Sequence, residues 1–536
     1  MSTKSAPKVG PTIRDNIELE NWTPAQISQI SGPPKEVWDN PDYNDIQNFG
    51  FFGKTLRPML RSRQFQFMLI IPNFLIFLMA ALSGFFGTDN ASVSLATVLT
   101  WIVWWAFLLL MIAGLSRLWC VICPFGAMGE WAHRFSLWGT GQKRFSLNFT
   151  WPKNLKGIWM VNAFFIFFLW MDNVFGFGNS PVLTGYFIVV LVVLDVGVGL
   201  VFEKRSFCRY MCPINGFIGL QGLFAGFEMR SKSSQVCRQC RGKWCLKGRE
   251  DDGGGYGCPM FLYPGGNDTN KYCILCTECL KSCPNNTMRL GTRPPLKDLW
   301  ANKAFSWDES FNIIALLGVS SIAPILLIKN TLKWQDWLLD NTPLTNTRYA
   351  DIFAKTGLYI GGLIVAFIVV ILFATIVSYV AKPEEGYKGW KHYANVYAAP
   401  LVPIPLMKLI ADISDHIVRN GSSVVWVVHN FIVDFPRGAE GSEKAGLGGL
   451  FDSETHKVYS PAALNDPVII FGIQAFFLTL GFFASAWAIW KTVSNWEPQR
   501  KFSSKREAKV AGLMMILFSV ALTLFNLYNV SGPAVA

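Results

Sequence analysis

The sequence predicts a mainly α-helical protein that crosses a membrane several times and carries one soluble, cysteine-rich insert. Hydrophobic residues make up 51% of the 536 residues and charged residues only 16%, against about 25% in an average soluble domain. Apolar runs of about 20 residues, the length that crosses a bilayer, recur along the chain. All 12 cysteines lie between Cys120 and Cys283. These features exclude a disordered chain and argue against a simple soluble enzyme.

The first half of the chain contains four apolar runs that we expect to span the membrane. Lys and Arg residues precede and follow each pair of runs, whereas the loop within each pair has none. The positive-inside rule therefore places the N-terminus in the cytoplasm. We expect residues 1–64 to form a cytoplasmic tail, either partly ordered or acting as an arm that docks a partner. The four runs are Phe65 to Phe86, Thr97 to Leu115, Ile158 to Phe177 and Val182 to Phe202.

The second half contains four further apolar runs and one ambiguous stretch. Basic residues at 382–388 and at 491–509 both look cytoplasmic, which requires one more crossing between them. The candidate, Tyr397 to Phe435, is interrupted by prolines and by Asn420-Gly421. Either a broken helix covered by protein crosses here, or the stretch lies in the interface and one charge assignment fails. The total is eight or nine spans, and the four clear runs are Phe311 to Ile328, Ile352 to Val380, Val468 to Trp490 and Val510 to Leu527.

Cysteine spacing in the insert indicates iron–sulfur chemistry. The run from Cys273 to Cys283 has the bacterial ferredoxin spacing Cys-x2-Cys-x2-Cys-x3-Cys-Pro, in which the fourth cysteine binds the other cluster of a two-cluster protein. Between Cys237 and Cys258 the spacing is Cys-x2-Cys-x4-Cys, then twelve residues and Cys-Pro. The crossed assignment gives two [4Fe–4S] clusters, one held by Cys237, Cys240, Cys245 and Cys283, the other by Cys258, Cys273, Cys276 and Cys279.

Two other uses of these cysteines fit less well. Thiols stay reduced on the cytoplasmic side, which disfavours a disulfide framework, and a zinc ribbon separates its two cysteine pairs by more residues. Basic residues surround the sites, and cationic neighbours favour the reduced, more negative cluster. The alternative is a solvated basic face that docks acidic partners. These residues are Arg238, Arg241, Lys243, Lys247 and Lys281.

The remaining four cysteines form an internal repeat at the membrane edge. Arg117-Leu-Trp-Cys120-Val-Ile-Cys123-Pro is followed, 89 residues later counted from Cys123 to Cys212, by Arg205-Ser-Phe-Cys208-Arg-Tyr-Met-Cys212-Pro. Each copy follows a helix that returns to the cytoplasm, so pseudo-symmetry could bring the four thiols together. Three interpretations stay open: structural positions beside the prolines, redox-active thiols, or a third metal centre, for which four soft ligands suit Cu(I), Zn or Fe–S chemistry.

The order of these motifs resembles that of the NapH/NosR-type membrane-bound ferredoxins, and the cytochrome-oxidase assembly ferredoxin CcoG shares related parts. The resemblance covers roughly Pro58 to Leu296. It implies electron transfer between the membrane quinone pool and a partner oxidoreductase or a metal-centre assembly system. Two differences stand out. We expect no N-terminal flavin-binding domain of the NosR kind, and an extension from about Asn302 to Ala536, with four or five spans, suggests a specialised subunit of a complex.

We therefore expect an iron–sulfur subunit that relays electrons between quinone and a partner oxidoreductase in a respiratory-type complex. One alternative is an assembly factor that reduces a metal or thiol of a partner enzyme through the membrane-edge cysteines; another is a mainly structural subunit. No nucleotide motif or Ser/His/Asp constellation stands out, so we expect an electron-transfer component rather than a stand-alone enzyme. The net charge of +12 marks cytoplasmic loops rather than a nucleic-acid face.

A few polar residues within apolar runs are further candidates. Asp195 lies inside the fourth run, where a charge costs about 2.5–3.5 kcal/mol on insertion scales. It could serve a proton relay or a quinone site, or form a buried interhelical hydrogen bond. His416 and His429 are 13 residues apart, but two haems need four axial histidines on crossing helices, so we do not expect haem.

These expectations divide the chain into four parts. Residues 1–64 form the tail, 65–229 a four-helix membrane domain with the duplicated Cys-Pro motifs, 230–300 the ferredoxin domain and 301–536 a C-terminal membrane domain. The protein is expected in a bacterial-type cytoplasmic membrane, in contact with lipid, with the ferredoxin domain on the cytoplasmic side.

Overall fold

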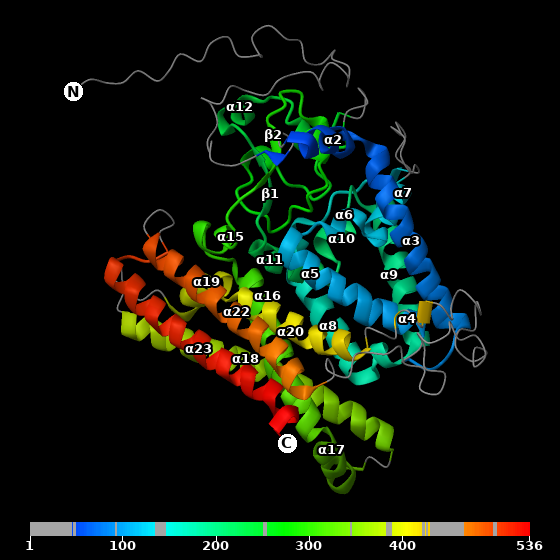
Figure 1. Ribbon diagram of the computed structural model, residues 1–536, viewed down its shortest axis with the longest axis vertical. Helices are drawn as coiled ribbons and strands as arrows, with labels where there is room; N and C mark the ends of the chain where they lie inside the picture. Colours follow the sequence, from blue (N-terminus) through cyan, green and yellow to red (C-terminus); the bar gives the residue numbers. More distant parts are fainter. Residues whose placement is uncertain are drawn as a thin grey trace.

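The computed structural model is mainly helical, with one two-stranded sheet (Figure 1). This agrees with the mainly α-helical fold that the sequence predicts. Several predictions lie outside the described residues: residues 1–44 of the tail, Lys382, Lys388, His429 and the later part of the stretch from Tyr397 to Phe435. The structure describes residues 45–46, 50–91, 94–134, 146–249, 255–343, 346–381, 389–420, 424, 427–428, 466–496 and 501–535.

The N-terminal membrane half consists of long helices joined by short ones. The helix α9 begins with Ser180 as its N-cap, whose Oγ accepts a hydrogen bond from Leu183 N at 3.4 Å, and Pro181 provides the favoured first helical residue. Before it, α8 ends at Gly176, which adopts a left-handed φ of 65°. The helices of this half are α2 (Gly50–Arg61), α3 (Arg63–Phe86), α4 (Leu95–Thr97), the π-helix η4 (Val98–Trp104), α5 (Trp105–Leu115), α8 (Trp159–Phe175) and α9 (Pro181–Val201).

Four short helices carry the duplicated Cys-Pro motifs. In the first copy α6 ends at Ile122, Cys123 is extended, and Pro124 starts α7. In the second copy the first cysteine again lies on a short helix, and a second helix follows the Cys-Pro pair. The two copies therefore share one local design despite their different spacing. They comprise α6 (Trp119–Ile122), α7 (Pro124–Arg134), α10 (Ser206–Tyr210) and α11 (Asn215–Gln221).

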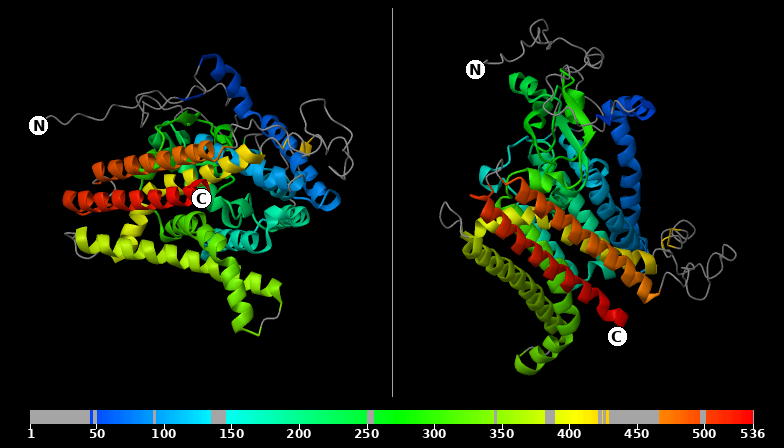
Figure 2. Two further views of the ribbon diagram at one scale, coloured as in Figure 1. Left: turned by 60° about the horizontal axis from the view of Figure 1, so that its bottom comes forward. Right: turned by 60° about the vertical axis from the view of Figure 1, so that its left-hand side comes forward.

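The ferredoxin insert is built on an antiparallel pair of strands, β1 (Phe227–Ser231) and β2 (Met288–Thr292), in which Met229 faces Leu290. Its first strand begins three residues before the expected boundary at 230. Loops and short helices between the strands carry all eight cysteines. Together with α2 it forms one end of the molecule (Figures 1 and 2). The helical pieces are α12 (Ser234–Gln239), α13 (Trp244–Lys247), η8 (Pro264–Gly266) and α14 (Glu278–Ser282).

The C-terminal half forms a second helical bundle, in which α22 and α23 lie side by side (Figure 2). A capping box starts α16: Ser306 N donates to Glu309 Oε2 at 3.1 Å. This half comprises α15 (Lys297–Ala301), α16 (Trp307–Leu317), the π-helix η9 (Gly318–Ile322), α17 (Ala323–Asn341), α18 (Thr347–Ala381), α19 (Gly389–Leu401), α20 (Pro403–Asn420), α22 (Pro467–Ser494) and α23 (Lys505–Val535).

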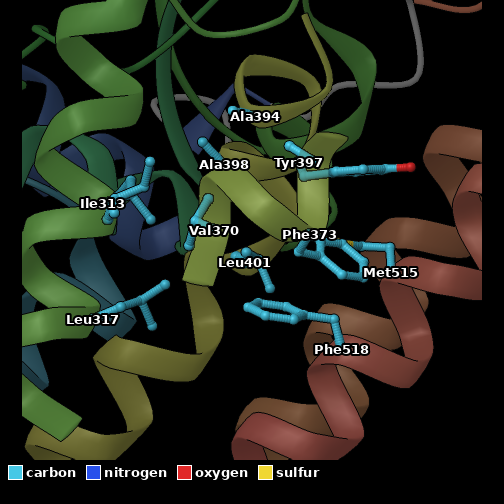
Figure 3. Close-up of a pocket in the computed structure, with 12 residues that line it drawn as sticks. Ile313, Leu317, Val370, Phe373, Ala394, Tyr397, Ala398, Leu401, Met515 and Phe518 are labelled. Carbon is cyan, nitrogen blue, oxygen red and sulfur yellow. The ribbon is translucent and has the colours of Figure 1, made fainter. Parts of the chain in front are cut away.

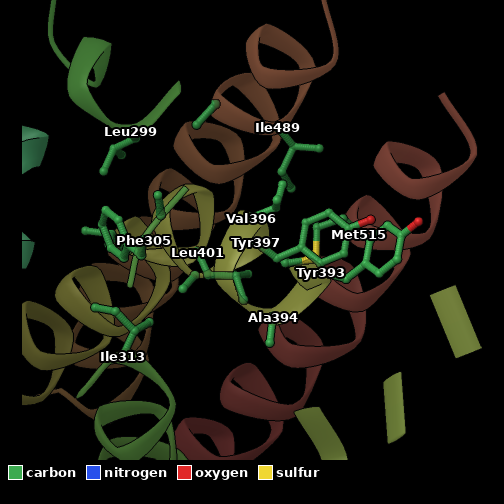
Figure 4. Packing of buried hydrophobic residues seen from close by; sticks show 14 of the residues in the cluster. Leu299, Phe305, Ile313, Tyr393, Ala394, Val396, Tyr397, Leu401, Ile489 and Met515 are labelled. Carbon is green, nitrogen blue, oxygen red and sulfur yellow. The ribbon is translucent and has the colours of Figure 1, made fainter. Parts of the chain in front are cut away.

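The bundle core is apolar. Side chains from α16, α18, α19, α22 and α23 meet around Tyr397 and Leu401 (Figure 4). A small cavity between α16, α18, α19 and α23 is lined by aliphatic and aromatic groups, including Ile313, Phe373 and Met515 (Figure 3). On the outer face of α18, in contrast, Ile364, Leu372 and other large apolar side chains are exposed. Such an apolar outer face is what a helix in contact with lipid requires.

Six described helices are long and apolar enough to cross a membrane, or seven if the bent pair α19 and α20 counts as one span with a bend of 44°. The predicted total of eight or nine is not confirmed. The third run forms only the 17-residue helix α8. The run from Phe311 to Ile328 is divided among α16, η9 and α17, and α17 also carries Lys333, Asp336 and Asp340. The six are Gln66–Phe86, Leu95–Leu115, Pro181–Val201, Thr347–Ala381, Pro467–Ser494 and Lys505–Val530.

Candidate iron–sulfur sites

The cysteines fall into three sets, which we name by their order from the ferredoxin end toward the membrane helices. The outer set is Cys237, Cys240, Cys245 and Cys283; the middle set is Cys258, Cys273, Cys276 and Cys279; the inner set is Cys120, Cys123, Cys208 and Cys212. All twelve are free thiols. Among the described residues, no three or more His, Cys, Asp or Glu side chains are grouped for a single metal ion.

The outer set lines one cavity. Cys283 reaches it although its three motif neighbours do not. Trp244, Tyr263 and Met288 complete the wall, and the Tyr263 hydroxyl donates to the Cys237 carbonyl at 2.6 Å. Four of the predicted basic residues near this set are exposed: Arg238, Arg241, Lys243 and Lys247. The predicted basic residues therefore give the outer site a positively charged surface, and only Lys281 is withdrawn from it, paired with Glu278 at 2.7 Å.

The middle set lines a second cavity. Its remaining wall is mostly apolar and includes Met229, Met260 and Ile274. The two cavities share a small hydrophobic core in which Cys245 and Cys279 pack with Leu275 and Leu280. The structure thus brings together each of the two predicted groups of four cysteines, and the binding of clusters by them stays a prediction.

The loops around the cavities contain backbone that few residue types adopt. Leu275 and Thr277, which lie on either side of Cys276 in the ferredoxin run, have φ of 59° and 62°, and Lys243 and Phe261 have 46° and 58°. Left-handed φ at a bulky residue costs roughly 1–3 kcal/mol and gathers at functional sites. In the ferredoxin run this backbone belongs to a loop from which Cys273, Cys276 and Cys279 all line the middle cavity. The residue types gave no signal for this conformation.

Burial makes these thiols poor acids by themselves. It raises the pKa of Cys258 to about 11 and of Cys245 to about 12, and it raises those of Cys273 and Cys283 as well. Hydrogen bonds from backbone amides lower the pKa of these thiols. Thr287 N, for example, donates to Cys283 Sγ at 3.4 Å. A bound metal group supplies the positive charge that buried thiolates require. The donor set and its surroundings therefore fit a cationic iron–sulfur core.

A buried ion network supports the strands next to the middle set. Arg293 pairs with Asp298, and Arg289 pairs with Glu228 at 3.1 Å. Arg230 donates to Asn270 Oδ1 at 2.8 Å, and Asn270 N donates to Asp298 Oδ2 at 2.8 Å. Three arginines share two carboxylates in this network, so most of its charge is compensated, and it stabilises the fold near Cys273.

The inner thiols also converge. Each of Cys123, Cys208 and Cys212 interacts electrostatically with another inner thiol from the opposite copy or the same copy of the repeat. Cys120 and Cys208 also pack against the apolar group formed by Cys258, Met260 and Ile274 of the middle site. The inner set is therefore in direct contact with the wall of the middle site. Burial raises the pKa of Cys123 to about 12.

Two buried arginines accompany the inner set, and the sequence interpretation gave them no role. Arg117 is 1% exposed and Arg205 is 4% exposed. Within the described part of the chain, Arg117 has neutral partners only: Lys271 O at 2.8 Å, Asn215 Oδ1, and Cys120 Sγ at 3.9 Å. Its Nε has no partner. A buried charge without a counter-charge is costly, so the inner site fits an anionic group such as a metal bound by thiolates.

Asp195 lies beside this site in an interhelical hydrogen bond. Its Oδ2 accepts from Gly129 N at 2.6 Å, and α7 and α9 approach so closely that a Cβ on Gly199 would lie 2.4 Å from Gly129 O. This matches the structural alternative for Asp195; a proton or quinone role stays a prediction. Of the described histidines, His133 contacts Ser146 Oγ at 2.7 Å, His392 contacts Lys501 O at 2.7 Å and His416 is exposed.

Comparisons with known proteins point to the same region. A family model described as a 4Fe-4S binding domain matches residues 97–146 and 184–227, which include all four inner cysteines. An uncharacterized protein of the archaeon Methanocaldococcus jannaschii is 24% identical over 237 residues, 44% of this chain and 85% of the relative. A second from the same organism is 26% identical over 103 residues, 19% of this chain and 37% of that protein. No solved structure matches. The chain is thus a multi-pass membrane protein, by helix length and composition, with a 4Fe-4S binding domain.

Proposed function

We propose that this protein is a membrane-bound electron carrier that connects a soluble redox partner on the cytoplasmic side with quinone in the membrane. The proposal depends on one observation, which is that the three cysteine sets contact one another in order from the ferredoxin end to the membrane helices. The outer and middle cavities share one hydrophobic core, and the middle site touches the inner set at the ends of the membrane helices. Such an arrangement supports a continuous route from the outer surface toward the membrane.

Each set has a distinct part in this route. The outer set lies beneath exposed Arg238, Arg241 and Lys247, and this positive surface suits an acidic redox partner. The middle set connects the outer and inner sets. When bound, each [4Fe–4S] cluster takes up and releases one electron at a potential set by ligands, charge and hydrogen bonds. The chain itself provides the thiolates, excludes water with Met260 and Ile274, and directs backbone amides at the sulfurs.

The inner set is proposed to hold a third iron–sulfur centre. The convergence of its thiols, the buried charge of Arg117 and the family match over both copies of the repeat all support this assignment. The alternative, in which these thiols reduce a metal or thiol of a partner enzyme, has no specific contact in its favour. The exposed apolar faces of the helices support direct contact with lipid, and the charge pattern supports a cytoplasmic ferredoxin domain.

The proposal is tested by counting iron and acid-labile sulfide in the purified full-length protein and recording EPR spectra after reduction. About twelve iron atoms per chain are expected, or about eight if only the outer and middle sets bind clusters. Fewer than about four would overturn the assignment. Replacing all inner cysteines with serine should remove about four iron atoms and stop reduction of a water-insoluble quinone. Lost partner maturation with unchanged quinone reduction would favour the assembly factor instead.

A further inference from the structure

We infer that Arg117 and Arg205 form a matched pair of positioning residues between the inner and middle sites, which hold the two halves of the inner set together and make both sites easier to reduce. This inference deepens the proposed function and depends on it. It concerns two residues to which the sequence interpretation gave no role. It is carried by the positions of the two residues in the repeat and by their contacts.

The two arginines occupy equivalent places in the repeat. Each lies three residues before the first cysteine of its own motif. Arg117 precedes Cys120, and Arg205 precedes Cys208. Both are almost completely buried, at 1% and 4% exposed. A buried arginine is rare unless it is paired or binds an anion. The same unusual feature at the same place in both copies indicates that it serves what the copies have in common, the inner cysteines.

Each arginine reaches across to the other copy of the repeat. Arg117 of the first copy donates to Asn215 Oδ1, three residues after Cys212. Arg205 of the second copy donates to the Cys120 carbonyl at 3.0 Å and pairs with Glu130 at 2.6 Å. The planar guanidinium provides several donors in a fixed geometry, which suits it to such crossed contacts. The arginines therefore fix how the two cysteine pairs face each other.

Each arginine also connects the inner set with the middle set. Arg117 lies 3.9 Å from Cys120 Sγ and donates to Lys271 O, two residues before Cys273. Arg117 also interacts with Cys212 and Cys273, and Arg205 interacts with Cys208 and Cys276. The two positive charges therefore lie between the same two sites, each next to one pair of thiols.

The charge of Arg117 is the less compensated of the two, because its partners in the described residues are neutral, whereas Arg205 has Glu130. A metal group held by four thiolates is an anion and becomes more negative on reduction. A nearby buried cation therefore favours the reduced form. The outer set has other arginines beside it: Arg61 interacts with Cys283, and Arg249 lies over the Trp244 ring. The effect of Arg117 and Arg205 is therefore expected at the middle and inner centres, whose thiols they approach.

The test is a redox titration of the full-length protein, followed by EPR, in Arg117→Gln, Arg205→Gln and the two Arg→Lys variants. Each glutamine variant should lower the reduction equilibrium constant of the middle and inner centres by at least about tenfold, 59 mV for one electron. The outer centre should not shift. Lysine variants, which keep the charge but not the geometry, should recover at least half of the shift. Arg117→Gln should have the larger effect.

A matched control is Arg289→Gln, which removes another buried arginine, one that interacts with Glu228, Asp45 and Arg230. It should lower stability without shifting any potential. Unchanged potentials in both glutamine variants at full iron content would overturn the inference. If a glutamine variant loses iron, the comparison moves to its lysine variant, which keeps the charge. There a potential close to that of the wild type would support the electrostatic part, and a tenfold or larger decrease of the reduction equilibrium constant at full iron content would overturn it. An iron content of eight in the wild type would contradict the third centre but leave the predicted shift at the middle site testable.

Discussion

Cys279 and Cys283 lie four residues apart in the chain but line different cavities. Cys279 faces the middle cavity with Cys258, whereas Cys283 faces the outer cavity with Cys237. Cys279 lies on α14, and Cys283 is the residue that follows this helix. The position of α14 therefore determines where one predicted ligand of each site lies.

The crossed ligand assignment predicts a specific pattern of iron loss. Cys283→Ala should remove about four iron atoms, and the double variant Cys237→Ala/Cys283→Ala should lose no more. Combining Cys237→Ala with Cys279→Ala should remove about eight, because the two residues serve different clusters. Iron and sulfide counts on the purified variants provide the measurement. If Cys279→Ala/Cys283→Ala lost only four, the two cysteines would belong to one cluster and the assignment would be wrong.

Packing at the inner set predicts that Gly126 tolerates no side chain. A Cβ there would lie 2.6 Å from Cys208 Sγ and 3.3 Å from Arg205 Nη1. Gly126→Ala should therefore displace Cys208 and reduce the iron content by up to about four atoms. The control is Gly197→Ala on α9, where nothing lies within 4 Å of the added group; it should keep all its iron and be neutral or slightly stabilising. Normal iron content in Gly126→Ala would contradict the close contact.

A buried lysine predicts a pH-dependent stability. Burial lowers the pKa of Lys501 to about 8, from an ordinary value of 10.5, and nearby Lys271 adds to the effect. The unfolded chain therefore binds one more proton than the folded chain between pH 8 and 10.5. Stability should rise with pH in this window, by up to about 1.4 kcal/mol per unit from this group. Denaturant titrations of wild type and Lys501→Met in detergent isolate the contribution: the slope should be smaller in the variant. Equal slopes would contradict the prediction.

We expect that breaking the ion pair on α20 lowers the free energy of unfolding more than breaking an exposed pair on α18 does. Lys408 is buried and pairs with Asp412, so Asp412→Asn leaves a buried charge without its partner, and a loss of about 3 kcal/mol is expected. Adding Lys408→Met should recover most of it. Asp351 and Lys355 form a pair of the same spacing on α18, but each is 31% exposed, so Asp351→Asn should cost less than about 1 kcal/mol. Denaturant unfolding in detergent measures both, and equal costs would contradict the difference in burial.

Sequence reasoning succeeded where the signal is local. The ligand spacing from Cys237 to Cys283 reflects short loops, and the structure places each predicted group around one cavity. The apolar runs on α3, α5, α9, α18, α22 and α23 were likewise visible because hydrophobicity and length suffice to identify them. The run from Phe311 to Ile328 was predicted as one span. Hydropathy does not reveal that the π-helix η9 interrupts it or that α17 continues beyond it with charged residues.

The remaining features depend on tertiary contacts. The repeat placed Arg117 and Arg205 at equivalent positions, and this could have identified them, but their crossed contacts with Asn215 and Cys120 exist only after the copies come together. The hydrogen bond from Gly129 to Asp195 likewise joins helices 66 residues apart in the chain. The left-handed backbone at Leu275 and Thr277 is imposed by the cavity, since neither residue type favours it.

The N-terminal segment is attached to the ferredoxin domain at three points. Asp45 pairs with Lys232 at 3.0 Å, Leu60 O accepts from Thr277 Oγ1 at 2.7 Å, and Arg61 donates to Asn286 Oδ1 at 2.5 Å. Since α2 leads directly into α3, the domain is anchored to the membrane helices both through its own ends and through this strap. A domain held at both places does not swing on a flexible link. Under the proposed function, a soluble partner would therefore have to diffuse to it and away again, and the rate of each encounter would depend on that partner's diffusion and charge.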